Sequence, residues 1–324
     1  MGEETKSGST VIIGAGAVGL ALGSCLHIAG ERIHFIVRPR SRPHPIEAHG
    51  IERRGLLGEA RVPPGSVEVS SSLAQLPDLA VDTILVCTKS TANNEVARDI
   101  AATWPRFARP PEVVVCQNGW GNAEAFAEVT QPEKVASASI LTGFRRIRDH
   151  AVAITVHAKA IQVGSLYTRD VEPLDRLCRA ISTGGIPCET NPAIEAELVA
   201  KLLYNCLLNP LGALTRAPYG RLGEGESTRG VMEAVAREIF SVLAAGDLRT
   251  HWPDADHYLE TFYRDLLPPT GDHESSMLQD LEASRRTEIE ALCGAVVELG
   301  AKYGVAAPVN AALRELIHAA ERRT

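Results

Sequence analysis

A glycine-rich turn near the start of the chain constrains the fold more than any other feature. Residues 10–13 form a short apolar run that predicts a buried strand, and residues 17–28 predict a helix. Between them stands Gly14-Ala15-Gly16-Ala17-Val18-Gly19. In such a turn the first glycine permits the tight bend, the second lets the backbone approach a pyrophosphate, and the third lets the helix pack closely on the strand. The context predicts a βαβ unit that binds a dinucleotide at the helix N-terminus.

The rest of the first half repeats this alternation of strand and helix. Short β-branched runs at 33–37, 83–87 and 113–116 are separated by helical stretches, which indicates a parallel sheet. Weaker strand signals at 151–156 and 160–163 predict the far edge of the same sheet. We therefore expect an α/β Rossmann-type domain with a parallel sheet over residues 1–190.

The second half has a helical pattern. Apolar residues recur three and four apart over 195–217, 229–246 and 276–303. Asn191 is expected to cap the first of these helices, with Pro192 in its first turn. A chain of 324 residues is long enough for two cores, so the sequence predicts an all-α C-terminal domain over residues 191–324.

Charge and cysteine usage limit the classes of partner. With 40 acidic and 33 basic side chains the net charge is -7, which gives no attraction for nucleic acid or for an anionic membrane. The seven cysteines show no metal-ligand spacing, and they fit a reducing cytoplasm and a protein without a metal site. Residues 11–30 are nearly uncharged and could be taken for a membrane anchor, but their glycines favour the strand-turn-helix interpretation.

The end of the second predicted strand indicates which dinucleotide binds. An NAD enzyme usually has an acidic side chain there, whereas this chain has Arg38, followed by Arg40 and Arg42. A guanidinium pairs with a 2′-phosphate, and a carboxylate would repel it. We therefore expect NADP(H), with Lys89 after the third strand as a further positive charge. For Arg40 and Arg42, simple solvation in a loop is an equally good interpretation.

A polar stripe marks the first helix of the second half. Lys201, Asn205 and Asn209 are spaced four apart, which places them within roughly 80° on one helix face. The stripe either faces solvent or lines a wet cleft. Asparagine is a poor residue for a helix interior, which favours the cleft.

A second polar group follows the start of a later helix. Ser275-Ser276-Met277-Leu278-Gln279-Asp280 is expected to open a helix that also carries Arg285, Arg286 and Glu288. The serine could simply be a cap. Glu288 could be a surface acid that Arg285 steadies from three residues earlier on the same helix.

Taken together and in order, these motifs resemble the ketopantoate reductase family. The resemblance covers nearly the whole chain and is carried by the Gly14 to Gly19 turn, Lys89, Gln117-Asn118-Gly119, Lys201 with Asn205 and Asn209, Ser275 to Asp280, and Arg286-Thr287-Glu288-Ile289. It implies a Rossmann domain followed by a helical domain of the 6-phosphogluconate dehydrogenase C-terminal type, with substrate held between them.

The resemblance also implies roles for individual residues. Lys201 would be the catalytic lysine and Glu288 its acidic partner. Substrate would be bound by Asn118, Asn205, Asn209 and Ser276. The cofactor would be held by residues 14–19, Arg38, Lys89, Asn118 and Glu288.

The implied reaction is the NADPH-dependent reduction of ketopantoate to pantoate, in pantothenate and coenzyme A synthesis. Hydride arriving at a ketone carbon leaves negative charge on the oxygen, which the ammonium of Lys201 can stabilise and protonate. Two alternatives stay open: reduction of another branched or aromatic 2-oxo acid, and an NADP-binding sensor without turnover. The expected partner is a small 2-oxo acid, a homodimer is a candidate assembly, and neither nucleic acid nor a membrane is expected.

Overall fold

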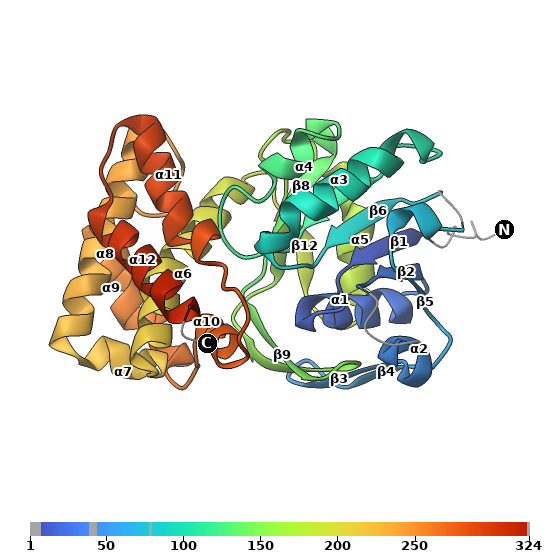
Figure 1. The fold of residues 1–324 in the computed structure, drawn as a ribbon, viewed down its shortest axis with the longest axis horizontal. Coiled ribbons are helices and arrows are strands. Elements are labelled where there is room, and N and C mark those ends of the chain that lie inside the picture. The colour runs from blue at the N-terminus through green and yellow to red at the C-terminus, as the bar shows by residue number, and fades with distance from the viewer. Residues whose placement is uncertain (1–7, 39–43, 78–79, 323–324) are drawn as a thin grey trace. The chain divides into compact units, whose positions relative to one another are not determined.

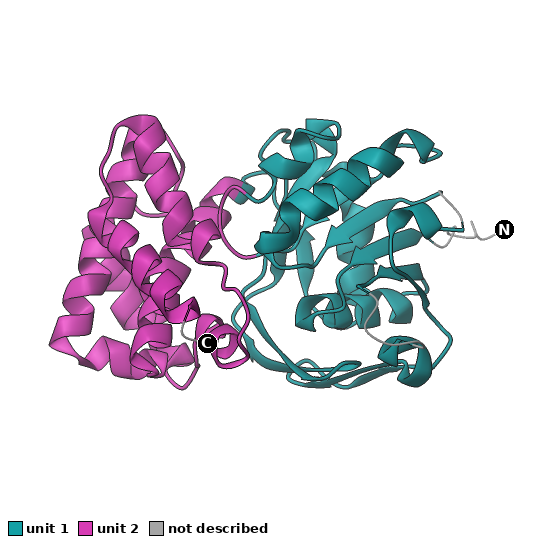
Figure 2. Cartoon of the chain, viewed as in Figure 1, with its two compact units in different colours: residues 1–117, 122–194 teal, residues 118–121, 195–324 magenta. Residues whose placement is uncertain are grey.

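The computed structural model of the chain describes residues 8–38, 44–77 and 80–322, which form two compact units (Figures 1 and 2). The first unit comprises the described residues up to Gln117 and those from Asn122 to Ile194. The second comprises Asn118–Gly121 and the described residues from Glu195 onward. The short segment after the strand at 112–115 therefore belongs to the same unit as the C-terminal half.

The first unit is built on an eight-stranded sheet with the strand order β12-β11-β8-β7-β6-β1-β2-β5. Its strands are β1 (Ser9–Ile13), β2 (Arg32–Ile36), β5 (Glu68–Ser70), β6 (Thr83–Val86), β7 (Glu112–Val115), β8 (Val135–Ser139), β11 (Ile161–Gly164) and β12 (Cys188–Thr190). Among the described strands of this sheet, every neighbouring pair is parallel except β8 with β11. The predicted parallel sheet is confirmed.

Helices cover both faces of this sheet, because successive strand residues point to opposite sides (Figure 1). They are α1 (Ala17–Ile28), α2 (Pro45–His49), α3 (Asn93–Thr103), α4 (Glu124–Ala127) and α5 (Glu172–Thr183). Ile12 and Leu85 pack into the apolar core that contains α1 and α5. Their neighbours Val11 and Ile84 pack into the core that contains α3 and α4. This is the doubly wound arrangement expected of a Rossmann-type domain.

A second sheet, with the order β4-β3-β10-β9, shares a core with α1. Its strands are β3 (Ile51–Gly55), β4 (Ala60–Val62), β9 (Thr142–Arg148) and β10 (Ala151–His157). Val152 and Ile154 of β10 are buried with Leu20 and Leu22 of α1, so this helix has apolar contacts on the side away from the main sheet. The prediction that 151–156 form the edge of the main sheet is wrong. The strand predicted at 160–163 is confirmed as β11, with β12 outside it.

In the second unit, the described residues form helices and turns without strands, which confirms the predicted all-α character. The helices are α6 (Ile194–Thr215), α7 (Tyr219–Glu224), α8 (Glu226–Ala245), α9 (Ala255–Thr261), α10 (Ser276–Glu282), α11 (Cys293–Tyr303) and α12 (Pro308–Glu321). The first of them starts two residues later than predicted. Asn191 accepts a hydrogen bond from the N–H of Ala193, at 2.7 Å, in the turn that precedes it.

The central helix of this unit is α6. Its leucines, including Leu202 and Leu207, lie in the core with Met232 and Ile239 of α8. By length and composition α6 could cross a membrane, but 72% of its apolar stretch is buried inside the protein, as expected of a core helix.

The long helix predicted over 276–303 is broken in the structure. Its first part, α10, ends at Glu282 in a Schellman motif: the N–H of Ser284 donates to Leu281 O (3.0 Å) and that of Arg285 to Asp280 O (2.8 Å). Ser284 has a φ of +51°, a left-handed conformation that ends the helix. Glu288 therefore lies in an irregular segment, and the prediction that it shares a helix with Arg285 is wrong.

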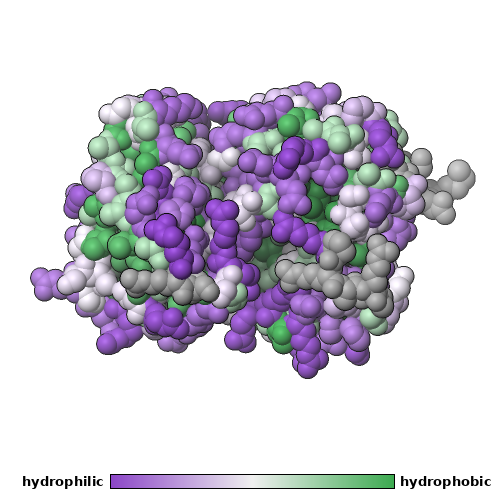
Figure 3. All heavy atoms as spheres, in the orientation of Figure 1, coloured by the Kyte–Doolittle hydropathy of each residue, from purple (hydrophilic) through white to green (hydrophobic). Residues whose placement is uncertain are grey.

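The face of the protein shown in Figure 3 is mostly hydrophilic, with apolar side chains scattered between polar ones. The most exposed large apolar side chain in the described part of the second unit is Leu316, on α12, which is 53% exposed. Isolated apolar residues of this kind are normal on a protein surface.

Candidate functional site

The Gly14 to Gly19 turn connects β1 to α1, as predicted, and its first and third glycines are required by the protein's own packing. Gly14 has a φ of +105°, and a Cβ there would lie 3.0 Å from the backbone of Cys87 and Thr88. A Cβ on Gly19 would lie 2.1 Å from the carbonyl oxygen of Gly14. Both positions therefore exclude any larger residue.

The second glycine, Gly16, is not required by packing within the protein. Gly16 has an ordinary φ of -76°, and the nearest protein atom to a Cβ there would be 3.8 Å away. The protein itself has room for a side chain, so its absence leaves a cradle that a ligand could fill. No side chain caps the N-terminus of α1, and its first turn contains no acidic residue. N–H groups without a side-chain cap and the helix dipole favour a phosphate at this position.

The neighbouring strand ends carry the two predicted basic residues. Arg38 follows β2, and its guanidinium forms an ion pair of 2.5 Å with Glu95 of α3. These side chains are 71% and 63% exposed, so the pair contributes at most about 1 kcal/mol. Lys89 follows β6 and is exposed. Arg40 and Arg42 lie outside the described residues.

The glycine turn, Arg38 and Lys89 all lie at the carboxyl ends of strands of this sheet. The chain runs from β1 to β2 on one side and continues with β6 on the other side of β1. In such a sheet the ligand crevice lies at the carboxyl ends of the strands where the order reverses. The turn after β1 and Lys89 after β6 are at this point, and Arg38 is at the end of the next strand.

A partly buried polar network at the same end of the sheet was not predicted from the sequence. The amide nitrogen of Gln117, directly after β7, donates to Asn93 Oδ1 (2.7 Å) and Thr88 Oγ (3.3 Å). Asn93 in turn donates to Asn122 Oδ1 at 3.0 Å. Gln117 Oε1 is buried without a hydrogen-bond partner among the described residues, which leaves an acceptor for a bound ligand. The sequence signal was available, since Gln117 is part of the motif that contains Asn118.

In the second unit, Asn118 and Glu288 come together although 170 positions separate them. The Asn118 amide donates to Glu288 Oε2 at 3.3 Å. Two residues on, the N–H of Trp120 donates to the carbonyl of Ala291 at 2.8 Å. Gly119 has a φ of +97°, and a Cβ there would lie 2.2 Å from the same carbonyl. The segment that holds Asn118 thus packs directly on the segment that holds Glu288.

The polar stripe of α6 is largely buried. Lys201 and Asn209 are only 7% and 4% exposed, and Asn205 is half-buried. The solvent-facing alternative is therefore wrong for Lys201 and Asn209. Glu288, which is likewise 7% exposed, adds a buried carboxylate to the same unit.

Asn209 has partners that the sequence did not predict. Its Oδ1 accepts a hydrogen bond from Tyr219 at 2.9 Å, and the Ser275 hydroxyl lies 3.1 Å from the same oxygen and 2.9 Å from the Asn209 carbonyl. Burial raises the pKa of Tyr219 far above its ordinary value, so the phenol remains a neutral donor. Only the amide N–H groups of Asn209 are left for a ligand.

Of the two adjacent serines, Ser275 is the helix cap. Its Oγ accepts from the N–H groups of Met277 (3.1 Å) and Leu278 (3.4 Å) at the start of α10. Ser276 is the first helical residue and is half-buried. The predicted substrate binder is thus the serine that the cap does not use.

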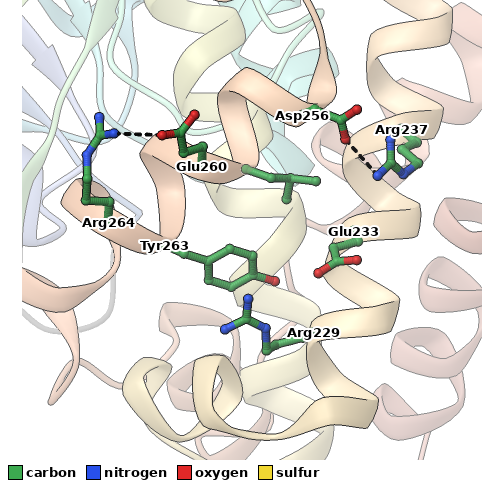
Figure 4. A pocket seen from close by; sticks show the side chains of 8 residues that line it. Arg229, Glu233, Arg237, Asp256, Glu260, Tyr263 and Arg264 are labelled. Atoms are coloured by element: carbon green, nitrogen blue, oxygen red, sulfur yellow. Dashed lines mark hydrogen bonds and ion pairs between the residues drawn. The ribbon is translucent and has the colours of Figure 1, made fainter.

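A depression with a volume of about 500 Å³ lies on α8, α9 and the helical turn at Phe262–Leu266; Figure 4 shows the side chains that line it. Among its charged residues, Arg237 pairs with Asp256 at 2.7 Å and Arg264 with Glu260 at 3.1 Å. Arg229 lies 3.9 Å above the ring of Tyr263. None of the residues predicted from the sequence lines this depression, and its arginines already have partners, so it is a charged helix surface.

Comparisons with known proteins cover both halves of the chain. Residues 10–167 match the sequence model of the family described as "Ketopantoate reductase PanE/ApbA", and residues 193–321 match "Ketopantoate reductase PanE/ApbA C terminal". A 2-dehydropantoate 2-reductase of Aquifex aeolicus (strain VF5) is 35% identical over 312 residues, which are 96% of each chain. One from Archaeoglobus fulgidus is 28% identical over 314 residues, 96% of this chain and 97% of the relative.

A solved structure is similar over the same extent. The crystal structure of a PanE/ApbA family ketopantoate reductase from Ralstonia eutropha JMP134 has a TM-score of 0.80 and 29% sequence identity, and the match covers 97% of this chain and 99% of that one.

The different reasons for the glycines give a testable contrast. We expect Gly16→Ala to keep the free energy of unfolding within about 1 kcal/mol of the native protein, because the protein leaves room for the methyl group. It should raise the Kd for NADPH at least about tenfold, since the methyl group occupies the place of the phosphate.

Gly19→Ala is the matched control and should unfold more easily by more than about 2 kcal/mol, because its Cβ overlaps a backbone carbonyl. Urea denaturation and NADPH fluorescence titration measure the two quantities. Native affinity in Gly16→Ala would contradict phosphate binding at this turn.

Proposed function

The chain belongs to the ketopantoate reductase family, and from this premise we propose that it reduces 2-dehydropantoate to pantoate with NADPH, the reduction used in pantothenate and coenzyme A synthesis. The observation that carries the proposal is the buried ammonium of Lys201 on α6, in a chain that also has a dinucleotide turn between β1 and α1. A ketone reductase needs both a proton donor and a hydride carrier, whereas a sensor without turnover has no use for the lysine.

Residues of the first unit would hold the cofactor. Its pyrophosphate fits the N-terminus of α1 at Gly16, where a Cβ would have met only the carbonyl of Cys87 at 3.8 Å. Arg38 and Lys89 supply positive charge for the 2′-phosphate, which carries nearly two negative charges. When bound, the reduced nicotinamide supplies the hydride for the ketone carbon.

Lys201 would act on the oxygen of the same ketone as the proton donor. Its Nζ stabilises the negative charge that develops on that oxygen and donates the proton that completes the hydroxyl group. Glu288 acts as the acidic partner that keeps the lysine charged. The Asn118 amide, which donates to Glu288 Oε2 at 3.3 Å, orients this carboxylate.

Three further side chains would bind the substrate's hydroxyl and carboxylate oxygens. Asn205 and Ser276 are half-buried and offer an amide and a hydroxyl. Asn209 contributes amide N–H groups only, because its oxygen accepts from Tyr219.

The seven cysteines are free thiols, which supports a reducing compartment such as the cytoplasm.

A substrate panel tests the activity directly. Purified protein with NADPH and a series of 2-oxo acids should show its highest kcat/KM with ketopantoate, followed as the loss of absorbance of the reduced nicotinamide. A clear preference for another branched or aromatic 2-oxo acid would replace the proposed substrate, and no turnover with any of them would favour a sensor.

Lys201→Ala tests the proton donor. We expect kcat to fall at least about a hundredfold, while the Kd for NADPH stays nearly unchanged, because the ammonium acts on the ketone oxygen and not on the nucleotide. Lys302→Ala, which removes an exposed lysine of α11, is the control and should keep native turnover. An active Lys201→Ala enzyme would rule out the role given to this lysine.

Arg38→Ala tests the preference for NADPH. Its KM for NADPH should rise at least about tenfold while that for NADH changes little, since only NADPH carries the 2′-phosphate. Glu95→Gln removes the competing carboxylate 2.5 Å from Arg38 and should leave the KM for NADPH equal or lower. Arg179→Ala, an exposed arginine of α5, serves as the control. An unchanged ratio of the two KM values in Arg38→Ala would exclude Arg38 from 2′-phosphate binding.

A further inference from the structure

The irregular segment that carries Glu288 is held by two side chains of α12. The N–H of Thr287 donates to Glu321 Oε1 at 2.7 Å. On the other side of Glu288, the carboxylate of Glu290 lies 2.6 Å from Nε2 of His318. Nδ1 of the same imidazole lies 3.1 Å from Glu321 Oε2. A continuous chain of hydrogen bonds therefore connects the residue before Glu288 with the second residue after it.

These hydrogen bonds are partly shielded from solvent. The side chains of His318 and Glu321 are only 21% and 15% exposed, and Glu290 is 50% exposed. Charged hydrogen bonds with partly buried partners are stronger than ion pairs in open solvent. Glu288 lies between α10, which ends at Glu282, and α11, which begins at Cys293, and it directly precedes a single 3-10 turn at Ile289–Ala291. The N–H of Ala291 donates to the Glu288 carbonyl at 3.1 Å, and the contacts from α12 add support on both sides of this residue.

We propose that His318 and Glu321 are positioning residues for Glu288, and that they hold its carboxylate in the orientation that the reduction requires. This inference rests on the proposed function, in which Glu288 is the acidic partner of Lys201. Neither residue of α12 needs to touch the substrate, since both act through the backbone of the segment and through Glu290.

The protonation state of His318 decides how many contacts it can make. A charged imidazole donates from both nitrogens, here to Glu290 and to Glu321, whereas a neutral one donates from one nitrogen only. Among the described residues, these two carboxylates are the charged groups for which the structure gives a contact with His318. Loss of the proton should thus release one end of the chain of hydrogen bonds.

The charges define a pH window for the complete arrangement. Burial lowers the pKa of His318, but its hydrogen bonds to the carboxylates of Glu290 and Glu321 and their negative charges outweigh this effect and raise the pKa above its ordinary 6.5. This contribution is complete below about pH 6.5 and is lost as the pH rises through the higher folded-state value. Burial raises the pKa of Glu321, but its hydrogen bonds from Thr287 and His318 outweigh it and lower the pKa below 4.5. This second contribution is lost only as the pH falls through that lowered value.

The test uses the full-length enzyme with NADPH and ketopantoate. His318→Ala and Glu321→Ala should each lower kcat at least about fivefold, with the KM for NADPH unchanged, because the reaction needs an oriented Glu288 and the nucleotide does not. His318→Gln keeps a donating nitrogen and roughly the size of the side chain, so it should recover part of the activity. It should also abolish the step in the kcat against pH profile that the native enzyme shows when His318 loses its proton.

Glu315→Gln is the matched control, because Glu315 lies on the same helix in an exposed pair with Arg314; it should keep native kcat and the native pH profile. Melting temperatures of all variants separate loss of folding from loss of orientation, and His318→Gln gives a folded variant if an alanine variant is unstable. Glu288→Gln is measured alongside. If it loses activity while His318→Gln and both alanine variants keep native kcat and pH profile, the inference is overturned and the proposed function stands. If Glu288→Gln is fully active, Glu288 has no role in the reduction and the inference is overturned, whereas the proposed function fails only if the native enzyme does not turn over ketopantoate.

Discussion

The first unit depends on one close approach between backbone atoms. The carbonyl oxygen of Gly14 occupies the place that a Cβ of Gly19 would need, at 2.1 Å, so α1 can lie directly against the end of β1. The helix is then enclosed, because the main sheet packs on one side and the sheet that contains β10 on the other. A helix that is enclosed on both sides and follows a short, tight turn cannot tilt or slide without loss of packing. Its N-terminus is thereby fixed at the carboxyl ends of β1 and β6, where a phosphate can use its N–H groups.

The second unit solves a different problem, which is how to keep polar side chains inside an apolar helical core. A buried polar group without a partner destabilises the fold, so each needs a hydrogen bond. Asn209 has Tyr219 and Ser275, and Glu288 has Asn118. Ser275 and Asn118 come from segments distant in sequence, so the bonds that satisfy these polar groups also connect separate parts of the unit. Asn205, at the margin of the core, is half-buried, and in the proposed function it binds the substrate.

Local patterns predicted those parts of the fold that depend on neighbouring residues. The glycine turn and the alternating strands were predictable because each follows from steric rules within a few residues. The second sheet was not predictable from local patterns, since its strand β10 pairs with β3, which lies far earlier in the sequence. The end of α10 was missed because Ser284 adopts a left-handed conformation usually taken by glycine. The stripe on α6 was recognised, but the burial of Asn209 depends on Tyr219, whose position no local pattern indicates.

The two residues proposed to act as a pair are supported in opposite ways, and this has a physical consequence. Lys201 lies within α6, a helix whose backbone is fixed by its own hydrogen bonds and whose leucines are buried. Glu288 lies between α10 and α11, where a single 3-10 turn and contacts with Gly119, Trp120 and α12 hold the backbone. A helix keeps its geometry at any pH at which the unit is folded. A segment that also relies on carboxylates and an imidazole loses part of its support when those groups lose their charges. Of the two partners, the carboxylate should therefore be the one whose orientation responds to pH.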